Sequence, residues 1–356
     1  MPKILGRQQA GDETAQKYPF WPERVYFEPG ALDYPRGKAL YELFKEKGLP
    51  LKMTSSHNRV TGIPGRTARE GFAAAKRTLV LAVRRSTAFQ SCKPSAHYQL
   101  PLATGCPGQC RYCYLHTTLG RKPYLRAYVN LEEIFDRAGR YIREREPEAT
   151  LFEGAAVSDP LFIEPFTGGL SAAINYFAGT ERGRFRFVTK FTNVEPLLQL
   201  SHRGHTRIRF SINAPEIIER FEFKTPRLSA RLKAAQKVIA SGYPAGFIVA
   251  PVFLESGWQE HYRRLFELLQ EHLPAPLPGL TFEFITHRFT LRARSNIEEI
   301  FPESGLDMDT EKRQFRYGQF GYGKYLYPPE LIKEAKDFLL DIVGHLYPEA
   351  TVEYFI

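Results

Sequence analysis

The chain of 356 residues is 43% hydrophobic and 25% charged, which is typical of a soluble globular protein with a sizeable core. Four cysteines without a secretory leader pattern favour a cytoplasmic location, and the absence of long apolar runs predicts no membrane partner. The 49 Lys and Arg residues exceed the 39 Asp and Glu residues, and the net charge of +10 favours an anionic partner.

The first part of the chain divides into a polar lead-in and a folded layer. Residues 1–20 show little periodicity and are expected to be mobile. Residues 21–95 are expected to form an N-terminal layer packed on the main body, not an independent domain. The elements predicted in this layer are strands at 24–27, 51–60 and 78–84 and a helix at 34–47 that ends at Gly48.

Between residues 96 and 290, apolar strand patterns alternate with amphipathic helices. This alternation predicts parallel β/α units in an α/β fold. The predicted strands are 97–102, 150–156, 184–190, 207–212, 245–252 and 279–286. The predicted helices are 131–146, 168–178, 194–200, 215–219, 227–241 and 257–273. Six such units fit a partial (β/α)6 barrel, in which functional residues gather at the carboxyl ends of the strands.

Residues 291–356 form the predicted C-terminal part. Aromatic residues alternate on both sides of a glycine turn in 315–327, which predicts a β-hairpin. An amphipathic helix at 329–346 and a last strand at 351–355 are expected to close the fold.

Three of the four cysteines, Cys106, Cys110 and Cys113, form a C-x3-C-x2-C array directly after a predicted strand. Thiolates at this spacing converge on a metal centre. A [4Fe–4S] cluster can be held by three cysteines with one iron left open, whereas a structural zinc ion requires four ligands. The cluster is the favoured prediction, and a zinc site completed by His116 or Cys92 is the alternative.

Further motifs accompany this array in a fixed order. They are LATGCxGxCxYCYLxTTLGxKPYxRxYVN at 102–130, RFVTK at 186–190, RFSIN at 209–213, GFIVAPV at 246–252, FEFITHRFT at 282–290 and GxxGxGKYxY at 318–327. Over residues 24–356 the chain resembles the spore photoproduct lyases, a family of radical S-adenosylmethionine (SAM) enzymes. The resemblance implies a radical SAM partial barrel and a DNA-repair lyase that splits a methylene-bridged thymine dimer, the spore photoproduct, into two thymines through a 5′-deoxyadenosyl radical. It also implies a flavodoxin- or ferredoxin-like electron donor as a partner.

The resemblance also assigns a cofactor site. It implies that Cys106, Cys110 and Cys113 are the ligands of the [4Fe–4S] cluster. The positions that it places near SAM, in the cysteine loop or at the carboxyl ends of predicted strands, are Tyr112, Ser158, Asp159, Lys190, Ser211 and Asn213. The residues by themselves leave two alternatives open, an exposed strand-end lysine at 190 and a helix N-cap at 213.

The second predicted barrel strand departs from the family pattern. The family carries F-E-A-A-C-T-S-D, whose cysteine donates a hydrogen atom to the thymine radical, but residues 152–159 read FEGAAVSD, with Ala156 at the cysteine position. An alanine C–H bond is too strong to donate. The leading substitute is direct donation by Tyr112 or Tyr114, which match the relay tyrosines of the family. Cys92 is the second candidate, and a reaction without an internal donor is the third.

The C-terminal part is expected to contact DNA. In the family the hairpin inserts at the lesion, where stacking and phosphate contacts offset the cost of extruding the linked bases. The candidate DNA-binding residues are Arg316, Gln319, Phe320, Lys324, His287 and Arg288. The missing cysteine keeps two other functions open: a radical SAM enzyme that acts on another nucleic-acid or nucleotide substrate, and a non-catalytic DNA-binding paralogue.

Overall fold

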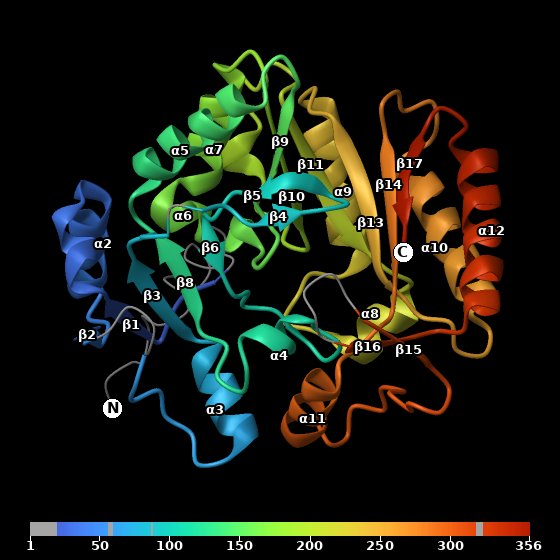
Figure 1. Cartoon of the computed structure of the whole chain (residues 1–356), viewed down its shortest axis with the longest axis horizontal. Helices are drawn as coiled ribbons and strands as arrows, with labels where there is room; N and C mark the ends of the chain where they lie inside the picture. The colour runs from blue at the N-terminus through green and yellow to red at the C-terminus, as the bar shows by residue number, and fades with distance from the viewer. Residues whose placement is uncertain (1–19, 56–59, 87, 318–322) are drawn as a thin grey trace, which may run out of the picture.

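The computed structural model describes residues 20–55, 60–86, 88–317 and 323–356. A smaller and a larger β-sheet dominate this part of the chain, and helices cover the outer face of the larger sheet (Figure 1). Both sheets contribute to one continuous hydrophobic core, to which Leu81 and Leu125 belong in the smaller sheet and Phe152 and Phe210 in the larger.

The smaller sheet has the strand order β2-β1-β3-β8-β6. Its strands are β1 (Arg24–Phe27), β2 (Leu51–Met53), β3 (Thr78–Ala82), β6 (Ala103–Thr104) and β8 (Leu125–Tyr128). Four of them run parallel, whereas β6 is antiparallel to β8. Every residue of β3 is buried, as expected for a central strand with apolar side chains on both faces.

The helical segments of the N-terminal layer are η1 (Pro29–Asp33), α2 (Pro35–Glu46) and α3 (Ala68–Ala75). A capping box starts α3: the Glu70 backbone N–H donates to the Thr67 hydroxyl (3.2 Å), and the Glu70 carboxylate accepts from the Thr67 backbone N–H (3.3 Å). The sequence did not predict α3 or β8. The strand predicted at 51–60 ends at Met53, at the exposed edge of the sheet, and residues 56–59 lie outside the described parts.

The larger sheet has the strand order β17-β14-β13-β11-β10-β9-β5-β4. Its strands are β4 (Ser91–Cys92), β5 (Ala96–Gln99), β9 (Thr150–Glu153), β10 (Gly183–Thr189), β11 (Thr206–Ile212), β13 (Ala245–Val252), β14 (Thr281–Thr286) and β17 (Thr351–Phe355). All neighbours run parallel except β4, which is antiparallel to β5. The sheet curls into a half-barrel, which confirms the predicted α/β fold class of a partial barrel.

Helices on the outside of the curled sheet connect its strands (Figure 1). They are α5 (Leu131–Glu144), η2 (Pro160–Ile163), α6 (Glu164–Thr167), α7 (Gly169–Ala178), α9 (Leu228–Ala240), α10 (Trp258–His272) and α12 (Pro329–Leu346), whereas α8 (Pro215–Phe221) lies below the sheet. In α5 the buried residues Leu131, Ile134, Phe135, Ala138 and Ile142 recur at helical spacing and form the face that packs on the core.

Three predictions in the barrel were wrong in extent. The strand predicted at 97–102 ends at Gln99. The strand predicted at 150–156 ends at Glu153, because its carboxylate accepts a hydrogen bond from the backbone N–H two residues later (3.0 Å) and the chain turns. The helix predicted at 194–200 is only the short 3-10 helix η3 (Glu195–Leu197). Its last carbonyl accepts a hydrogen bond from the hydroxyl of Tyr243 (2.6 Å), which fixes the end of the segment.

The C-terminal part contains α11 (Leu291–Ile300) and a two-stranded hairpin. The hairpin strands β15 (Gln314–Tyr317) and β16 (Gly323–Leu326) are antiparallel, so the predicted hairpin is confirmed. A bridge between Phe289 and Tyr325 joins the hairpin to the chain that leaves β14. The hairpin is therefore fixed at its base next to the carboxyl end of the barrel.

Three short elements form the cysteine region at the same end of the barrel. They are β7 (Gln109–Cys110), α4 (Leu115–Thr118) and β12 (Glu222–Phe223). Figure 1 shows α4 close to α8 and α11 below the curled sheet. No helix within the described ranges is both long and apolar enough to cross a membrane.

A layer of buried charges fills the interior of the half-barrel. Arg209 donates to both carboxylate oxygens of Glu283 (2.9 and 2.6 Å) and also pairs with Glu153. Arg186 pairs with the same Glu283, and the exposed fraction of each of these side chains is at most 4%. The charges alternate with phenylalanine and isoleucine along the strands because alternate residues of a strand face opposite sides. The layer ties β9, β10, β11 and β14 together.

We predict that Arg209→Met lowers the free energy of unfolding by about 3–5 kcal/mol, because the buried Glu153 then lacks its arginine partner and Glu283 keeps only Arg186. Urea denaturation followed by circular dichroism measures this change. The control is Lys237→Ala, which breaks the exposed ion pair with Glu195 (2.5 Å) and should cost about 0–1 kcal/mol. Equal effects of the two substitutions would contradict the structural role of the buried layer.

Candidate active site around the cysteine loop

The cysteine loop, residues 105–119, is anchored at the carboxyl ends of the barrel strands. The Gly105 backbone N–H donates to the carbonyl of Val157, beyond the end of β9 (2.9 Å). Gly105 has a φ of 79°, and a Cβ there would lie 2.7 Å from the carbonyl oxygen of Tyr124, so the loop entry requires glycine. Further along, β7 pairs antiparallel with β12. The loop is thus tied to two separate parts of the barrel.

Helices α3 and α11 hold the loop from the other side. His116 of α4 stacks on Phe72 of α3 (ring centroids 5.5 Å apart), and its carbonyl accepts from the amide of Asn296 in α11 (2.7 Å). Burial and then the charge of Lys76 lower the pKa of His116 to about 4, so the ring is neutral at pH 7. Lys76 also donates to the carbonyl of Cys106 (2.7 Å).

The three cysteines fit an iron–sulfur cluster. The Gly108 N–H donates to Sγ of Cys106 (3.3 Å), and a Cβ at Gly108 would lie 3.3 Å from that sulfur and 3.0 Å from Thr225. Burial raises the pKa of Cys110 to about 12, although Lys190 acts in the opposite direction. Among the residues described, no three His, Cys, Asp or Glu side chains converge on one point that could hold a single ion. Three cysteines can hold a four-iron cluster with one iron left open, whereas a structural zinc ion requires four ligands.

Glu222 connects the cysteine loop to the barrel. Its buried carboxylate accepts hydrogen bonds from the Tyr112 hydroxyl, from Nζ of Lys190 (2.8 Å) and from Nη2 of Arg231 (2.5 Å). Nζ of Lys190 also donates to the Tyr112 hydroxyl (3.0 Å). Burial alone would raise the pKa of Glu222, but Lys190 and Arg231 outweigh it and lower the pKa to about 2. The carboxylate is therefore ionised and holds Tyr112 and Lys190 beside Cys110.

Ser158 and Asp159 were predicted to end the second barrel strand but follow the turn after β9, and their surroundings differ. The buried hydroxyl of Ser158 has no hydrogen-bond partner among the described residues. Asp159, in contrast, accepts from the Thr189 hydroxyl (2.7 Å) and from the backbone N–H of Lys190 (2.7 Å). Burial raises the pKa of Asp159 to about 6 despite these bonds. The unpaired hydroxyl of Ser158 suits a polar group of a bound cofactor, whereas Asp159 joins β9 to β10.

Ser211 and Asn213 lie at the carboxyl end of β11, and both are buried. The carbonyl of Ser211 accepts from Nη1 of Arg231 (2.9 Å). The amide of Asn213 donates to the carbonyl of Pro251 (2.8 Å), and its oxygen accepts from the backbone N–H of Ala214 (3.0 Å). Ala214 itself is the N-cap of α8, so Asn213 connects β11 to β13 from the position before the cap.

Tyr114 lies next to the position of the missing cysteine. Its hydroxyl donates to the backbone carbonyl of Ala156, and 59% of its side chain is exposed at the mouth of the barrel. Tyr112, two residues earlier, is partly buried in the contacts with Glu222. The structure thus separates the two predicted tyrosines: one faces the open site, and the other belongs to the ionic network that holds the loop.

Three of the predicted DNA-binding side chains gather at the hairpin. Arg316 in β15 and Lys324 in β16 are direct cross-strand partners, so they share one face of the hairpin. Burial, followed by the charge of Arg288, lowers the pKa of Lys324, which places Arg288 beside it. Phe315 and Tyr317 of β15 are 47% and 79% exposed. Gln319 and Phe320 lie outside the described residues.

His287 was predicted to contact DNA, but the structure buries it. Only 2% of the residue is exposed, and its ring packs against Phe253 (centroids 4.8 Å apart). Arg313 donates to its carbonyl (3.0 Å). Burial and the charge of Arg313 lower the pKa of His287 to about 3. This environment supports a neutral packing histidine and argues against direct contact with a phosphate.

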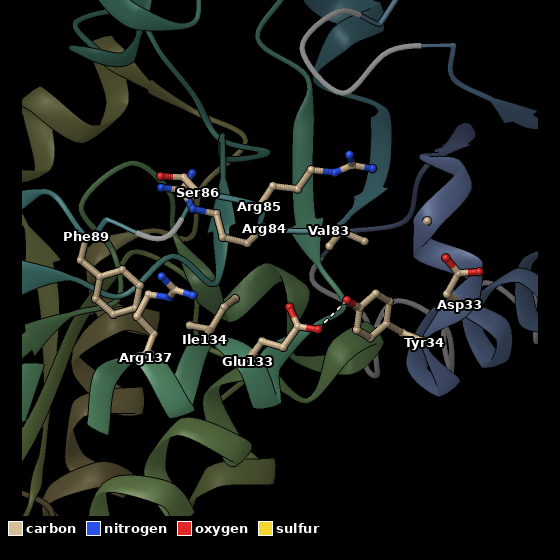
Figure 2. A pocket seen from close by; sticks show the side chains of 11 residues that line it. Asp33, Tyr34, Val83, Arg84, Arg85, Ser86, Phe89, Glu133, Ile134 and Arg137 are labelled. Carbon is tan, nitrogen blue, oxygen red and sulfur yellow. Dashed lines mark hydrogen bonds between the residues drawn. The ribbon is translucent and has the colours of Figure 1, made fainter. Parts of the chain in front are cut away.

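A cavity of about 360 Å³ lies away from the cysteine loop, between η1, α5 and the segment that follows β3. Figure 2 shows Arg84, Arg85 and Arg137 around it, with the Tyr34 hydroxyl donating to Glu133 (2.6 Å). This contact and then burial raise the pKa of Tyr34 to about 12. None of the predicted site residues within the described ranges lines the cavity.

Sequence reasoning missed Glu222, Arg231 and the charged layer in the barrel. Glu222 stands in an unremarkable FEF segment after a helix, and no local pattern marks it. The layer did have a signal. The segments RFRF at 184–187, RIRF at 207–210 and FEF at 282–284 place charged residues at alternate positions of strands that are otherwise apolar. Such a pattern indicates charges that face a shared interior.

A half-barrel of parallel β/α units with a three-cysteine loop at the carboxyl ends of its strands defines a radical SAM enzyme. The model of the family described as spore photoproduct lyase matches residues 20–356. The chain therefore belongs to the spore photoproduct lyase family, as its motifs predicted, and is a lyase of the radical SAM class.

Curated relatives and solved structures agree with this assignment. The chain is 48% identical over 338 residues to spore photoproduct lyase of Geobacillus sp. (strain Y412MC61), covering 95% of this chain and 99% of the relative. It is 47% identical over 338 residues to spore photoproduct lyase of Bacillus subtilis (strain 168), with the same coverage. A solved double mutant of spore photoproduct lyase with bound AdoMet and dinucleoside spore photoproduct matches with a TM-score of 0.93 at 50% identity, covering 95% of this chain and 100% of that one.

We predict that His287 makes folding stability dependent on pH between about 6.5 and about 3. Its pKa is lower in the folded state, so in this range the unfolded chain binds a proton that the folded chain does not, and stability falls as the pH falls. The limiting slope is about 1.4 kcal/mol per pH unit.

Urea denaturation at several pH values tests this expectation. His287→Gln should flatten the fall in stability, whereas His345→Gln, at an exposed position on α12, should leave it unchanged. An unaltered pH profile in His287→Gln would contradict the buried, neutral state of this ring.

Proposed function

We propose that this protein is a spore photoproduct lyase that uses SAM and a [4Fe–4S] cluster to split the methylene-bridged thymine dimer in DNA into two thymines. The observation that carries the proposal is the 0.93 TM-score, at 50% identity, to a spore photoproduct lyase with both AdoMet and dinucleoside photoproduct bound. Near-complete coverage of both chains means that the whole fold is matched. The cysteine loop lies at the end of the barrel where such sites form.

Cys106, Cys110 and Cys113 would hold the cluster, and Ser158, with its unpaired buried hydroxyl, would contact SAM. When bound, these groups supply a reductively generated 5′-deoxyadenosyl radical. Lys190 and Tyr112 are held at the loop by Glu222 and would meet the polar end of SAM. Asp159, Ser211 and Asn213 support this site by fixing the strand ends on which it stands.

Tyr112 and Tyr114 would serve the return of hydrogen after the dimer bridge breaks. A phenol O–H bond is weak enough to give up a hydrogen atom, whereas the methyl group of Ala156 is not. Tyr114 is the better placed of the two, because it faces the open mouth and contacts the backbone of residue 156. Tyr112 is bound to a buried carboxylate and a lysine, which suits it to positioning.

The hairpin would bind the damaged DNA. Arg316, Lys324 and Arg288 form a positive cluster suited to phosphates, and the exposed rings of Phe315 and Tyr317 offer surfaces for base stacking. His287 would act through packing. Gln319 and Phe320, which stand between the two strands in the sequence, would contact the lesion.

Electrons would come from a flavodoxin- or ferredoxin-like donor in the cytoplasm. A second candidate function is that of a radical SAM enzyme with another nucleic-acid or nucleotide substrate. The alanine at position 156 favours it, because the changed donor position is compatible with a changed product. A non-catalytic DNA-binding paralogue is disfavoured by the intact cysteine array and its supporting contacts.

We expect the anaerobically reconstituted protein to convert dinucleoside spore photoproduct into thymine residues in the presence of SAM and a reductant. Liquid chromatography with mass spectrometry measures both thymine formation and SAM cleavage. Replacing Cys106, Cys110 and Cys113 by alanine should abolish both. Vigorous SAM cleavage without any consumption of the photoproduct would contradict the proposed substrate and favour the second candidate.

We predict that Arg288→Gln combined with Lys324→Gln weakens DNA binding and lowers the slope of log K against log salt concentration by about 1 for each lost phosphate contact. Fluorescence anisotropy with a photoproduct-containing oligonucleotide at several salt concentrations measures this slope. Lys336→Gln, on the outer helix α12, is the matched control and should leave the slope unchanged. A slope that the double substitution does not alter would remove the hairpin cluster from the DNA interface.

A further inference from the structure

We propose that Cys92 is the hydrogen-atom donor of this enzyme and takes the place of the cysteine that Ala156 replaces, with Tyr114 returning the hydrogen to it. This inference rests on the proposed lyase function and specifies one step of it. Tyr114 is then the second member of the return path and not the group that quenches the substrate radical.

The fold brings Cys92 next to the charged layer in the interior of the half-barrel, although it lies fourteen residues before the first cysteine of the loop. Cys92 ends the short strand β4, which pairs with β5 at the edge of the larger sheet. Strand β5 in turn pairs with β9, whose end leads into the turn that contains Ala156. Cys92 therefore lies on β4 and Ala156 just after β9, two strands that are both paired with β5 in the larger sheet.

The charged layer in the barrel fixes the segment that carries Cys92. The hydroxyl of Ser95 donates to the Glu153 carboxylate (2.7 Å), and its carbonyl accepts from Nη1 of Arg186 (3.1 Å). Nη1 of Arg209 also reaches the Ser95 hydroxyl (3.3 Å). The turn between β4 and β5 is thus clamped onto the barrel interior, three residues after Cys92.

Tyr114 connects the two positions. Its hydroxyl donates to the carbonyl of Ala156, and its phenol interacts electrostatically with Cys92, Cys113 and Glu153. The phenol consequently lies near residue 156, near the Cys92 thiol and near a predicted cluster ligand. No other cysteine outside the C-x3-C-x2-C array exists in the sequence.

An engineered relative has the same pair of residues. In the solved double mutant with bound AdoMet and dinucleoside spore photoproduct, a cysteine is replaced by alanine and an earlier serine by cysteine. The two substituted positions lie the same number of residues apart as Cys92 and Ala156 lie here. With 50% identity and complete coverage of that chain, the spacing identifies the two pairs as equivalent. A site with this arrangement therefore accepts cofactor and substrate together.

The chemistry of a thiol fits the step. Burial, followed by the charge of Glu153, raises the pKa of Cys92 to about 12, so the side chain is an S–H group at neutral pH and holds the atom to be given. Homolysis of the S–H bond transfers one hydrogen atom to the methylene carbon of the thymine radical and leaves a thiyl radical on Cys92. Transfer of a hydrogen atom from the Tyr114 hydroxyl restores the thiol. The hydrogen atom removed from the substrate at the start of the turnover then returns to Tyr114, so the enzyme ends the turnover with all its hydrogen atoms restored.

The test compares thymine formed with 5′-deoxyadenosine formed, using dinucleoside spore photoproduct, SAM and the reconstituted full-length enzyme. Cys92→Ala should lower this ratio at least tenfold while SAM cleavage continues, because the substrate radical still forms but is not quenched correctly. Cys92→Ser should behave in the same way, since an alcohol O–H bond is too strong to donate. Ser91→Ala, the neighbouring exposed position of β4, is the control and should retain the wild-type ratio.

The decisive experiment moves the thiol from residue 92 to residue 156. The double variant Cys92→Ala with Ala156→Cys should recover most of the thymine yield, which a purely structural role of Cys92 would not allow. An unchanged ratio in Cys92→Ala overturns the inference and assigns direct donation to a tyrosine. Failure of the double variant to recover, with substrate still bound, also overturns it. A wild-type enzyme that forms no thymine contradicts the proposed function itself, so the two failures are distinguishable.

Discussion

The buried ion pairs between strands β9, β10, β11 and β14 are the interaction on which the site depends. Charges removed from water are stable only when each has a partner at close range, so the positions of Arg186, Arg209 and Glu283 are fixed by one another. Glu153 belongs to the same layer and also receives the backbone N–H that turns the chain after β9. That turn carries Ala156 and leads to Ser158, so the order of the barrel interior is transmitted to the mouth.

A second buried carboxylate performs a comparable task for the cysteine loop. Glu222 joins the loop to β10 through Lys190 and to α9 through Arg231. Its backbone pairs with Cys110 in the β7–β12 ladder, so one residue supports both the main chain and the side chains of the loop. The proposed cluster site is therefore held from the barrel side by charge and from the other side by the ring contact of α3 and the hydrogen bond of α11.

The outcome at particular residues shows which signals in the sequence were reliable. The hairpin at 315–327 was predictable because aromatic alternation around glycines is a local pattern. The end of β9 was not predictable. It depends on a hydrogen bond from the backbone to the side chain of Glu153, and the orientation of this side chain is set by Arg209, 56 residues away. His287 shows the same limit: its place at a strand end suggested contact with DNA, but the packing of Phe253 and Arg313 buries it.

The sequence by itself determined the family, the cysteine loop and the absence of the usual donor at residue 156, because each of these is a matter of residue identity at a fixed spacing. The tertiary structure alone decided which residues meet. Cys92 lies on β4 and Ala156 in the turn after β9, and nothing in the local sequence of Cys92 connects it with Tyr114. Only the pairing of β4, β5 and β9 brings this thiol to the charged layer of the half-barrel and near Tyr114, since strand order is set by long-range packing and not by neighbouring residues.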